Sequence, residues 1–159
     1  MSFTHLHLLM NHFPVIGTIL GIALLGIAVF RRSSELGKVS LGLFVALAAI
    51  AIGVYLTGEP AEEAIEKLPG FSEAITERHE EFALVATIGL GILGALALGA
   101  LAVFRKRLLP RWVTLGVFSL SLIAGGLMSY TAMLGGQVRH TEVRSGAPVI
   151  ESPGQENPD

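Results

Sequence analysis

The stretch PVIGTILGIALLGIAVFRR, residues 14–32, decides the fold class, because an uninterrupted apolar run ends abruptly in two arginines. The hydrocarbon core of a bilayer is crossed by about 20 apolar residues in a helix, each adding ~1.5 Å along the axis. No charged residue precedes Arg31 in this stretch. We therefore predict a helix that spans a membrane and ends at the arginines.

The composition extends this prediction to the whole chain. Of the 159 residues, 52% are hydrophobic and 15% are charged, and the mean hydropathy is +0.65. An ordinary soluble domain has an apolar share nearer ~45–50%. The chain also contains no cysteine, which excludes disulfides, thiolate zinc sites, cysteine-ligated iron–sulfur clusters and covalently attached c-type haem. We expect an integral membrane protein whose metal ligands, if it has any, are His, Met, carboxylate or backbone groups.

Four apolar segments are present, and with their helical extensions they predict spans at about 5–30, 39–57, 73–104 and 112–134. We expect an all-α four-helix bundle over 1–144, built from two tandem helical hairpins. The segment 145–159 is rich in Pro, Gly and Glu, and we expect it to be a disordered tail.

Cationic side chains predict the orientation of the bundle. Seven of the eleven Lys and Arg residues follow the first and third spans, where the only acid is Glu35. These seven are Arg31, Arg32, Lys38, Arg105, Lys106, Arg107 and Arg111. By the positive-inside rule these turns are cytoplasmic, so both termini and the loop 58–81 are outside. No basic region precedes the first span, which disfavours a cleaved signal peptide.

The outer loop 58–81 is strongly acidic. It carries eight glutamates against one lysine and one arginine, a net charge of −6. Pro60 suits a first helical position, Pro69 and Gly70 break the chain, and Ser72 can cap a helix that continues into the third span. We expect a lid of two short helices, which either steers a cationic partner or is a solvated acidic surface.

An internal repeat relates the two hairpins. A shift of 74 positions aligns Ala28–Arg31 with Ala102–Arg105, and Val39–Phe44 with Val113–Phe118. Such copies would be related by a pseudo-two-fold axis along the membrane normal. The same shift places His5 on His79.

Helix rise tests the pairing of these histidines. In unbroken helices His5 and His79 each lie about 39 Å above the arginine that ends their span. His5 and His12 share a helix face, whereas His7 points roughly 160° away from His5. We expect one ligand from the segment 5–12, with His5 or His12 favoured, opposite His79, and His140 as its chief rival.

Histidines gathered at one end of a helical bundle suit a b-type haem. Such a haem needs facing imidazoles, small residues beside the ring and cations near its propionates. Glycines are plentiful in the spans, although each is also explained by helix packing. The predicted haem-binding residues are His5, His7, His12, His79 and His140, with Arg78 and Arg139 near the propionates.

Other readings stay open. The segment with His5, His7, Met10 and His12 can bind copper, and histidines with carboxylates can bind iron or zinc. Candidate metal ligands are His5, His12, His79, His140, Glu59, Glu63 and Glu80. No charged residue lies within the apolar segments 14–30, 39–57, 82–104 and 112–134, which argues against a secondary transporter, and no basic patch suits nucleic acid. A third reading is a scaffold subunit without a cofactor.

Three stretches carry a family resemblance: HLHLLMNHFPVIG (5–17), TGEPAEEAIEKLPGFSEAITERHEE (57–81) and LGGQVRHTEVR (134–144). They resemble a family of small four-helix bacterial inner-membrane proteins of uncharacterised function. That family is similar to a broader domain-of-unknown-function group marked by His-Pro-x-x-x-His-Phe-Pro and Gly-Gly…His, some of whose members are joined to redox domains. The broader pattern maps onto His7, His12 and His140, with Leu8 in place of its proline.

The resemblance implies a bacterial inner-membrane protein in a redox setting. We expect an electron-transfer module or a small subunit of a respiratory complex rather than a stand-alone enzyme. Its expected partners are other membrane subunits or a second copy, a quinone or a periplasmic cytochrome c, and the lipid bilayer, with no nucleic acid.

Overall fold

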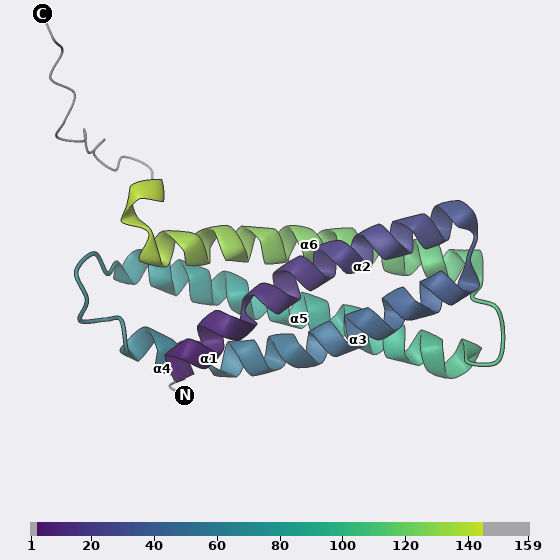
Figure 1. Ribbon diagram of the computed structural model, residues 1–159, viewed down its shortest axis with the longest axis horizontal. Coiled ribbons are helices and arrows are strands. Elements are labelled where there is room, and N and C mark those ends of the chain that lie inside the picture. Colours follow the sequence, from purple (N-terminus) through teal and green to yellow (C-terminus); the bar gives the residue numbers. More distant parts are fainter. Residues whose placement is uncertain (1–2, 145–159) are drawn as a thin grey trace, which may run out of the picture.

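A computed structural model describes residues 3–144, and the expected disorder of 145–159 lies outside these residues. Long helices run side by side along the longest axis, with short helical segments at one end (Figure 1). The elements are α1 Phe3–Met10, α2 His12–Arg31, α3 Ser34–Leu56, α4 Gly58–Glu63, α5 Glu73–Phe104, α6 Arg111–Arg139 and the 3₁₀ turn η1 Thr141–Val143. The described residues form no strand, which confirms the all-α expectation.

Four helical stretches are long and apolar enough to cross a membrane: Thr4–Arg31, Ser34–Leu56, Glu73–Phe104 and Arg111–Arg139. They coincide with the four expected spans to within a few residues at most ends, and the first runs through the junction of α1 and α2. Their surfaces carry large half-exposed apolar side chains, among them Ile19, Ile52, Ile88 and Ile123. So much apolar surface is unfavourable in water but suits contact with lipid.

The four long helices form a closed ring of neighbours. Helix α3 packs between α2 and α5, and α6 packs between α5 and α2. The centre is filled by Leu25, Phe44, Leu90 and Leu93, all with no exposed surface. A pseudo-two-fold relation between the hairpins is compatible with this ring and stays a prediction.

Small residues allow the helices to approach closely. A Cβ built on Gly94 of α5 would lie 2.5 Å from the Ala48 Cβ of α3, and it would also crowd the Phe44 carbonyl oxygen at 3.3 Å. Gly21 of α2 likewise leaves room for the Phe44 ring. In lipid, where water does not drive helices together, such close packing is a main source of association.

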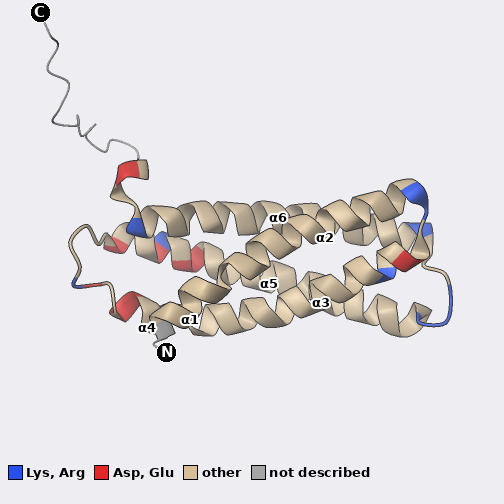
Figure 2. Cartoon of the chain, viewed as in Figure 1, with Lys and Arg blue, Asp and Glu red and all other residues tan. Residues whose placement is uncertain are grey.

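Charges are segregated along the bundle. Lys and Arg gather at the end where α2 meets α3 and α5 meets α6, and most Asp and Glu lie at the opposite end (Figure 2). The acidic end holds α1, α4, the start of α5 and the end of α6 (Figure 1). The chain breaks there at Gly70, which has a φ of +85°, and α5 begins after Ser72. Pro60 is the third residue of α4, and the second expected short helix is the first part of α5.

Candidate functional site

His7 is turned from α1 toward the end of α3. Its Nδ1 atom lies 3.1 Å from the Val54 carbonyl oxygen and 3.2 Å from the Thr57 hydroxyl oxygen. The Thr57 hydroxyl donates its own proton to the same Val54 carbonyl, at 2.8 Å. The Val54 carbonyl and the Thr57 hydroxyl are therefore both acceptors for Nδ1. In a neutral imidazole this arrangement places the ring proton on Nδ1. Nε2 is then left with the lone pair.

His79 of α5 is held in the same way against α6. Its Nδ1 atom lies 3.1 Å from the carbonyl oxygen of Thr131, an acceptor that again places the proton on Nδ1. The Thr131 hydroxyl bonds the Phe82 and Leu127 carbonyl oxygens, at 3.2 and 2.9 Å, which ties α6 to α5 beside the histidine. Gly135 makes room for the ring, because a Cβ there would lie 3.0 Å from His79 Cε1.

These two imidazoles lie at the same end of the bundle, on α1 and at the start of α5. His7 and His79 lie close enough to interact electrostatically, although 72 positions separate them in the chain. Both are partly buried, and both rings are oriented by a backbone carbonyl that leaves Nε2 unprotonated. Histidines that bind metals almost always have their other ring nitrogen bonded in this manner. Each of the two imidazoles therefore offers an Nε2 lone pair of the kind that binds metals.

Asn11, four residues after His7, has a buried side-chain polar atom. Its backbone N–H donates to the His7 carbonyl oxygen, at 2.9 Å. Within residues 3–144 its side-chain Oδ1 is the one buried side-chain polar atom without a hydrogen-bond partner. An orphaned buried acceptor costs roughly 1–3 kcal/mol and calls for a donor, such as a bound water or a polar group of a ligand.

The other expected histidines lie elsewhere. His5 and His12 are exposed, and His12 Nδ1 lies 3.2 Å from the Leu8 carbonyl oxygen of its own segment. His140 is exposed beyond α6, with its Nδ1 2.9 Å from a Glu142 carboxylate oxygen. The helical wheel favoured His5 or His12 opposite His79 and ranked His7 last, whereas the partly buried histidines of the structure are His7 and His79.

A signal for His7 was present in the sequence. The buried face of α2 contains Pro14, Gly21 and Ala28, seven residues apart, and one further step toward the N-terminus reaches His7. Likewise, Ala86 and Leu93 are buried on α5 seven residues apart, and a further step of seven toward the N-terminus reaches His79. Extending the buried face of each span toward the acidic end identifies both His7 and His79. Comparing the positions of the histidines only with one another instead favoured His5 and His12, which are exposed.

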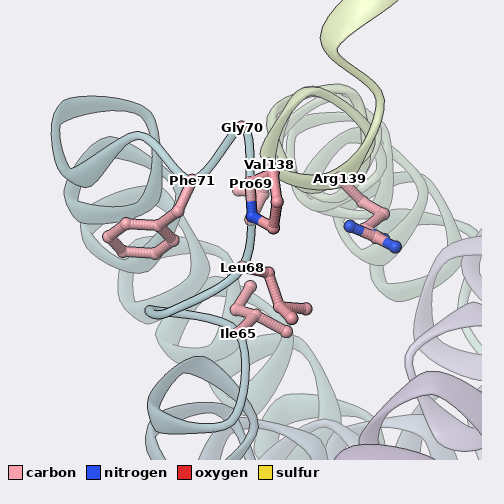
Figure 3. A pocket seen from close by; sticks show the side chains of 7 residues that line it. All are labelled: Ile65, Leu68, Pro69, Gly70, Phe71, Val138 and Arg139. Carbon is pink, nitrogen blue, oxygen red and sulfur yellow. The ribbon is translucent and has the colours of Figure 1, made fainter.

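Two arginines were expected near the propionates. Arg78 donates to the Tyr130 hydroxyl oxygen, at 2.9 Å, and the Tyr130 ring packs edge-on against Phe82. Arg139 borders a recess beneath the loop at Pro69 and Gly70 (Figure 3). That recess has a cavity volume of about 10 Å³, the size of a single water. The loop packs over this recess, which is too small for a ligand larger than a water molecule.

Acidic side chains form a second feature of this end. Glu62 of α4 shares a hydrogen bond with Glu80 of α5, and this bond, burial and the charges of Glu80, Glu66 and Glu59 raise the pKa of Glu62 to about 7. Among residues 3–144, no three His, Asp or Glu side chains lie close enough together to hold a metal ion. The expected ligands Glu59, Glu63 and Glu80 therefore form no such group. Within the described residues, His7 and His79 therefore have no third His, Asp or Glu gathered beside them.

The fold defines a class of protein: four apolar helices are compatible with a multi-pass membrane protein. Comparison of the chain with protein-family models, curated proteins and solved structures gives no match.

Proposed function

We propose that this protein is a membrane-embedded electron-transfer protein that holds a haem b between His7 and His79. The supporting observation is the matched hydrogen bonding of the two rings, each with Nδ1 at 3.1 Å from a backbone carbonyl oxygen. Axial ligation of a haem iron needs two neutral imidazoles that each offer one lone pair. It does not need the third protein ligand that a mononuclear zinc or non-haem iron site requires.

The surrounding residues fit such a group by their chemistry. The carbonyls of Val54 and Thr131 hold the rings in one tautomer, which raises the basicity of Nε2 and fixes the ring planes. Gly135 accommodates the His79 ring itself, because a Cβ there would lie 3.0 Å from Cε1 of that ring. A bound haem would supply one-electron chemistry, and this chain would set its potential through burial and through these hydrogen bonds.

The distribution of charges supports an orientation of the protein in the membrane. With the basic end in the cytoplasm, the histidine pair lies near the periplasmic face of a bacterial inner membrane, and both termini are outside. The acidic loop 58–81 then faces a periplasmic partner such as a basic cytochrome c. Membrane subunits of a respiratory assembly, a second copy and a quinone are the other proposed partners.

The visible spectrum of detergent-purified protein from haem-replete cells tests the proposal. Wild type should show a low-spin α-band on reduction, and His7→Ala and His79→Ala should each abolish it or convert the haem to high spin. His12→Ala is the matched control, because this nearby histidine is exposed, and it should retain the spectrum. Size-exclusion profiles and helical circular dichroism establish that each variant is folded.

Three results would overturn the haem proposal. Haem that survives both His7→Ala and His79→Ala would place the ligands elsewhere. Purified protein with stoichiometric copper, iron or zinc but no haem would favour the metal-site alternative. Folded protein with neither haem nor metal, from cells that supply both, would favour the scaffold subunit.

A further inference from the structure

The basic end of the bundle contains a cavity that the haem proposal does not use. It has a volume of about 140 Å³, roughly ten times the space that one water needs. It lies between the α2–α3 turn and the start of α6. Its lining residues are Ala28, Val29, Arg32, Ser33, Ser34, Leu109, Arg111 and Thr114. The lining of the cavity therefore combines two arginines and three hydroxyl-bearing residues with apolar ones.

Arg32 occupies a backbone position that favours glycine. It is the C-cap of α2, with φ 53° and ψ 36°, and no other non-glycine residue among 3–144 has a positive φ. Glycine is usual at such helix ends because other side chains are strained there. An arginine in a strained position that also borders a cavity indicates that its side chain serves a purpose other than ending the helix.

Two serine hydroxyls complete the polar lining. Ser33 Oγ accepts a hydrogen bond from the Leu36 N–H at 3.3 Å, and Ser34 Oγ accepts from the Leu109 N–H at 2.9 Å. A hydroxyl that accepts one bond still has its own proton to donate. The Ser34–Leu109 bond also joins the α2–α3 turn to the α5–α6 connection, so both connections hold the cavity in shape.

The surroundings of the cavity are cationic and lie at the end of the apolar spans. The neighbouring connection contributes Arg105, Lys106 and Arg107, and Glu35 is the only acid in the two basic turns and does not line the cavity. Phe30 and Trp112 are 91% and 74% exposed next to these cations. Exposed aromatic rings beside cations are typical of the lipid headgroup level.

We infer that this cavity binds the phosphate of an anionic membrane lipid. Arg32 at the C-cap of α2 and Arg111 at the start of α6 can pair with phosphate oxygens, and the Ser33 and Ser34 hydroxyls can donate to the same group. Ala28 and Val29 offer contact to the glycerol and acyl region. Basic pockets between transmembrane helices on the cytoplasmic side bind such headgroups. The inference does not depend on a haem at the opposite end.

Native mass spectrometry of the full-length protein in detergent tests the inference. Cardiolipin, phosphatidylglycerol, phosphatidylcholine and inorganic phosphate are added separately at equal phosphate concentration. We expect the anionic lipids to be retained at least fivefold more than phosphatidylcholine, and Arg32→Gly and Arg111→Gln to remove most of this preference. Arg32→Gly is informative because glycine relieves the backbone strain, so loss of lipid cannot be attributed to unfolding.

The matched control is Arg107→Gln, which removes a cation from the same end of the bundle but not from the cavity lining. It should retain the lipid preference. An equal loss in Arg107→Gln would overturn the inference in favour of diffuse electrostatic attraction. Absence of any preference among the lipids would also overturn it, and retention of inorganic phosphate without lipid would overturn the lipid assignment in favour of a soluble phosphate.

Discussion

Glu62 on α4 and Glu80 on α5 are joined by a side-chain hydrogen bond, so one of these two acids holds a proton. The bond raises the pKa of Glu62 to about 7, with burial and three neighbouring carboxylates adding to the effect. It connects the short helix that covers the acidic end to the helix that carries His79.

This bond predicts a pH-dependent attachment of α4. Since the pKa of Glu62 is higher in the folded protein than its ordinary 4.5, the stabilisation is fully present below about pH 4.5 and is lost as the pH rises through about 7. The chain has no cysteine, so spin labels can be placed at Glu63→Cys and Glu77→Cys. The distance distribution should be narrow at pH 5 and broad at pH 8.5.

Glu62→Gln is the control for this experiment, because an amide donates to the Glu80 carboxylate at either pH. In the Glu62→Gln protein the distribution of distances between the two spin labels should stay narrow at both pH 5 and pH 8.5. Identical distributions at pH 5 and 8.5 without that substitution would show that the shared proton does not hold α4.

Gly135 and Gly136 form a matched pair beside His79. A Cβ on Gly135 would lie 3.0 Å from the His79 ring, whereas a Cβ on Gly136 has nothing within 4 Å. We expect Gly135→Ala to be at least ~1 kcal/mol less stable than Gly136→Ala in detergent unfolding, because the ring must shift. Haem content, if the proposal holds, should fall in Gly135→Ala only. Equal stability and equal haem content would contradict this geometry.

The crossing of α3 and α5 gives a second matched pair. Gly94→Ala places a methyl group 2.5 Å from the Ala48 Cβ and should destabilise the bundle by about 1–3 kcal/mol. Gly91→Ala, where nothing lies within 4 Å, should be neutral or gain up to ~1 kcal/mol from helix propensity. Unfolding in a denaturing detergent measures both, and a Gly94→Ala protein as stable as Gly91→Ala would show that the helices do not cross here.

The orientation predicts which face each loop reaches. With the basic end in the cytoplasm, a membrane-impermeant maleimide added to intact spheroplasts should label Glu66→Cys and not Lys106→Cys. After the membrane is permeabilised, both should be labelled. The reverse pattern in intact spheroplasts would move the histidine pair to the cytoplasmic side and remove the argument for periplasmic partners.

The sequence alone determined the class of fold. Four apolar runs, each long enough to cross a bilayer, and the break at Pro69 and Gly70 follow from local composition, and the four candidate spans of the structure lie at these runs, the first of them covering α1 and α2. The separation of charges was also visible, because cations and acids alternate between successive connections along the chain.

Tertiary structure decided which side chains meet. His7 bonds to Val54 and Thr57, and His79 bonds to Thr131, over separations of 47 to 52 residues that no local pattern specifies. The exposed faces of these spans are as apolar as the buried ones, so hydrophobic periodicity marks the inner face weakly in a membrane helix. The small residues along each inner face carry the stronger signal, and packing of α1 against the end of α3 holds His7 beside Val54 and Thr57, whereas His5 and His12 stay exposed.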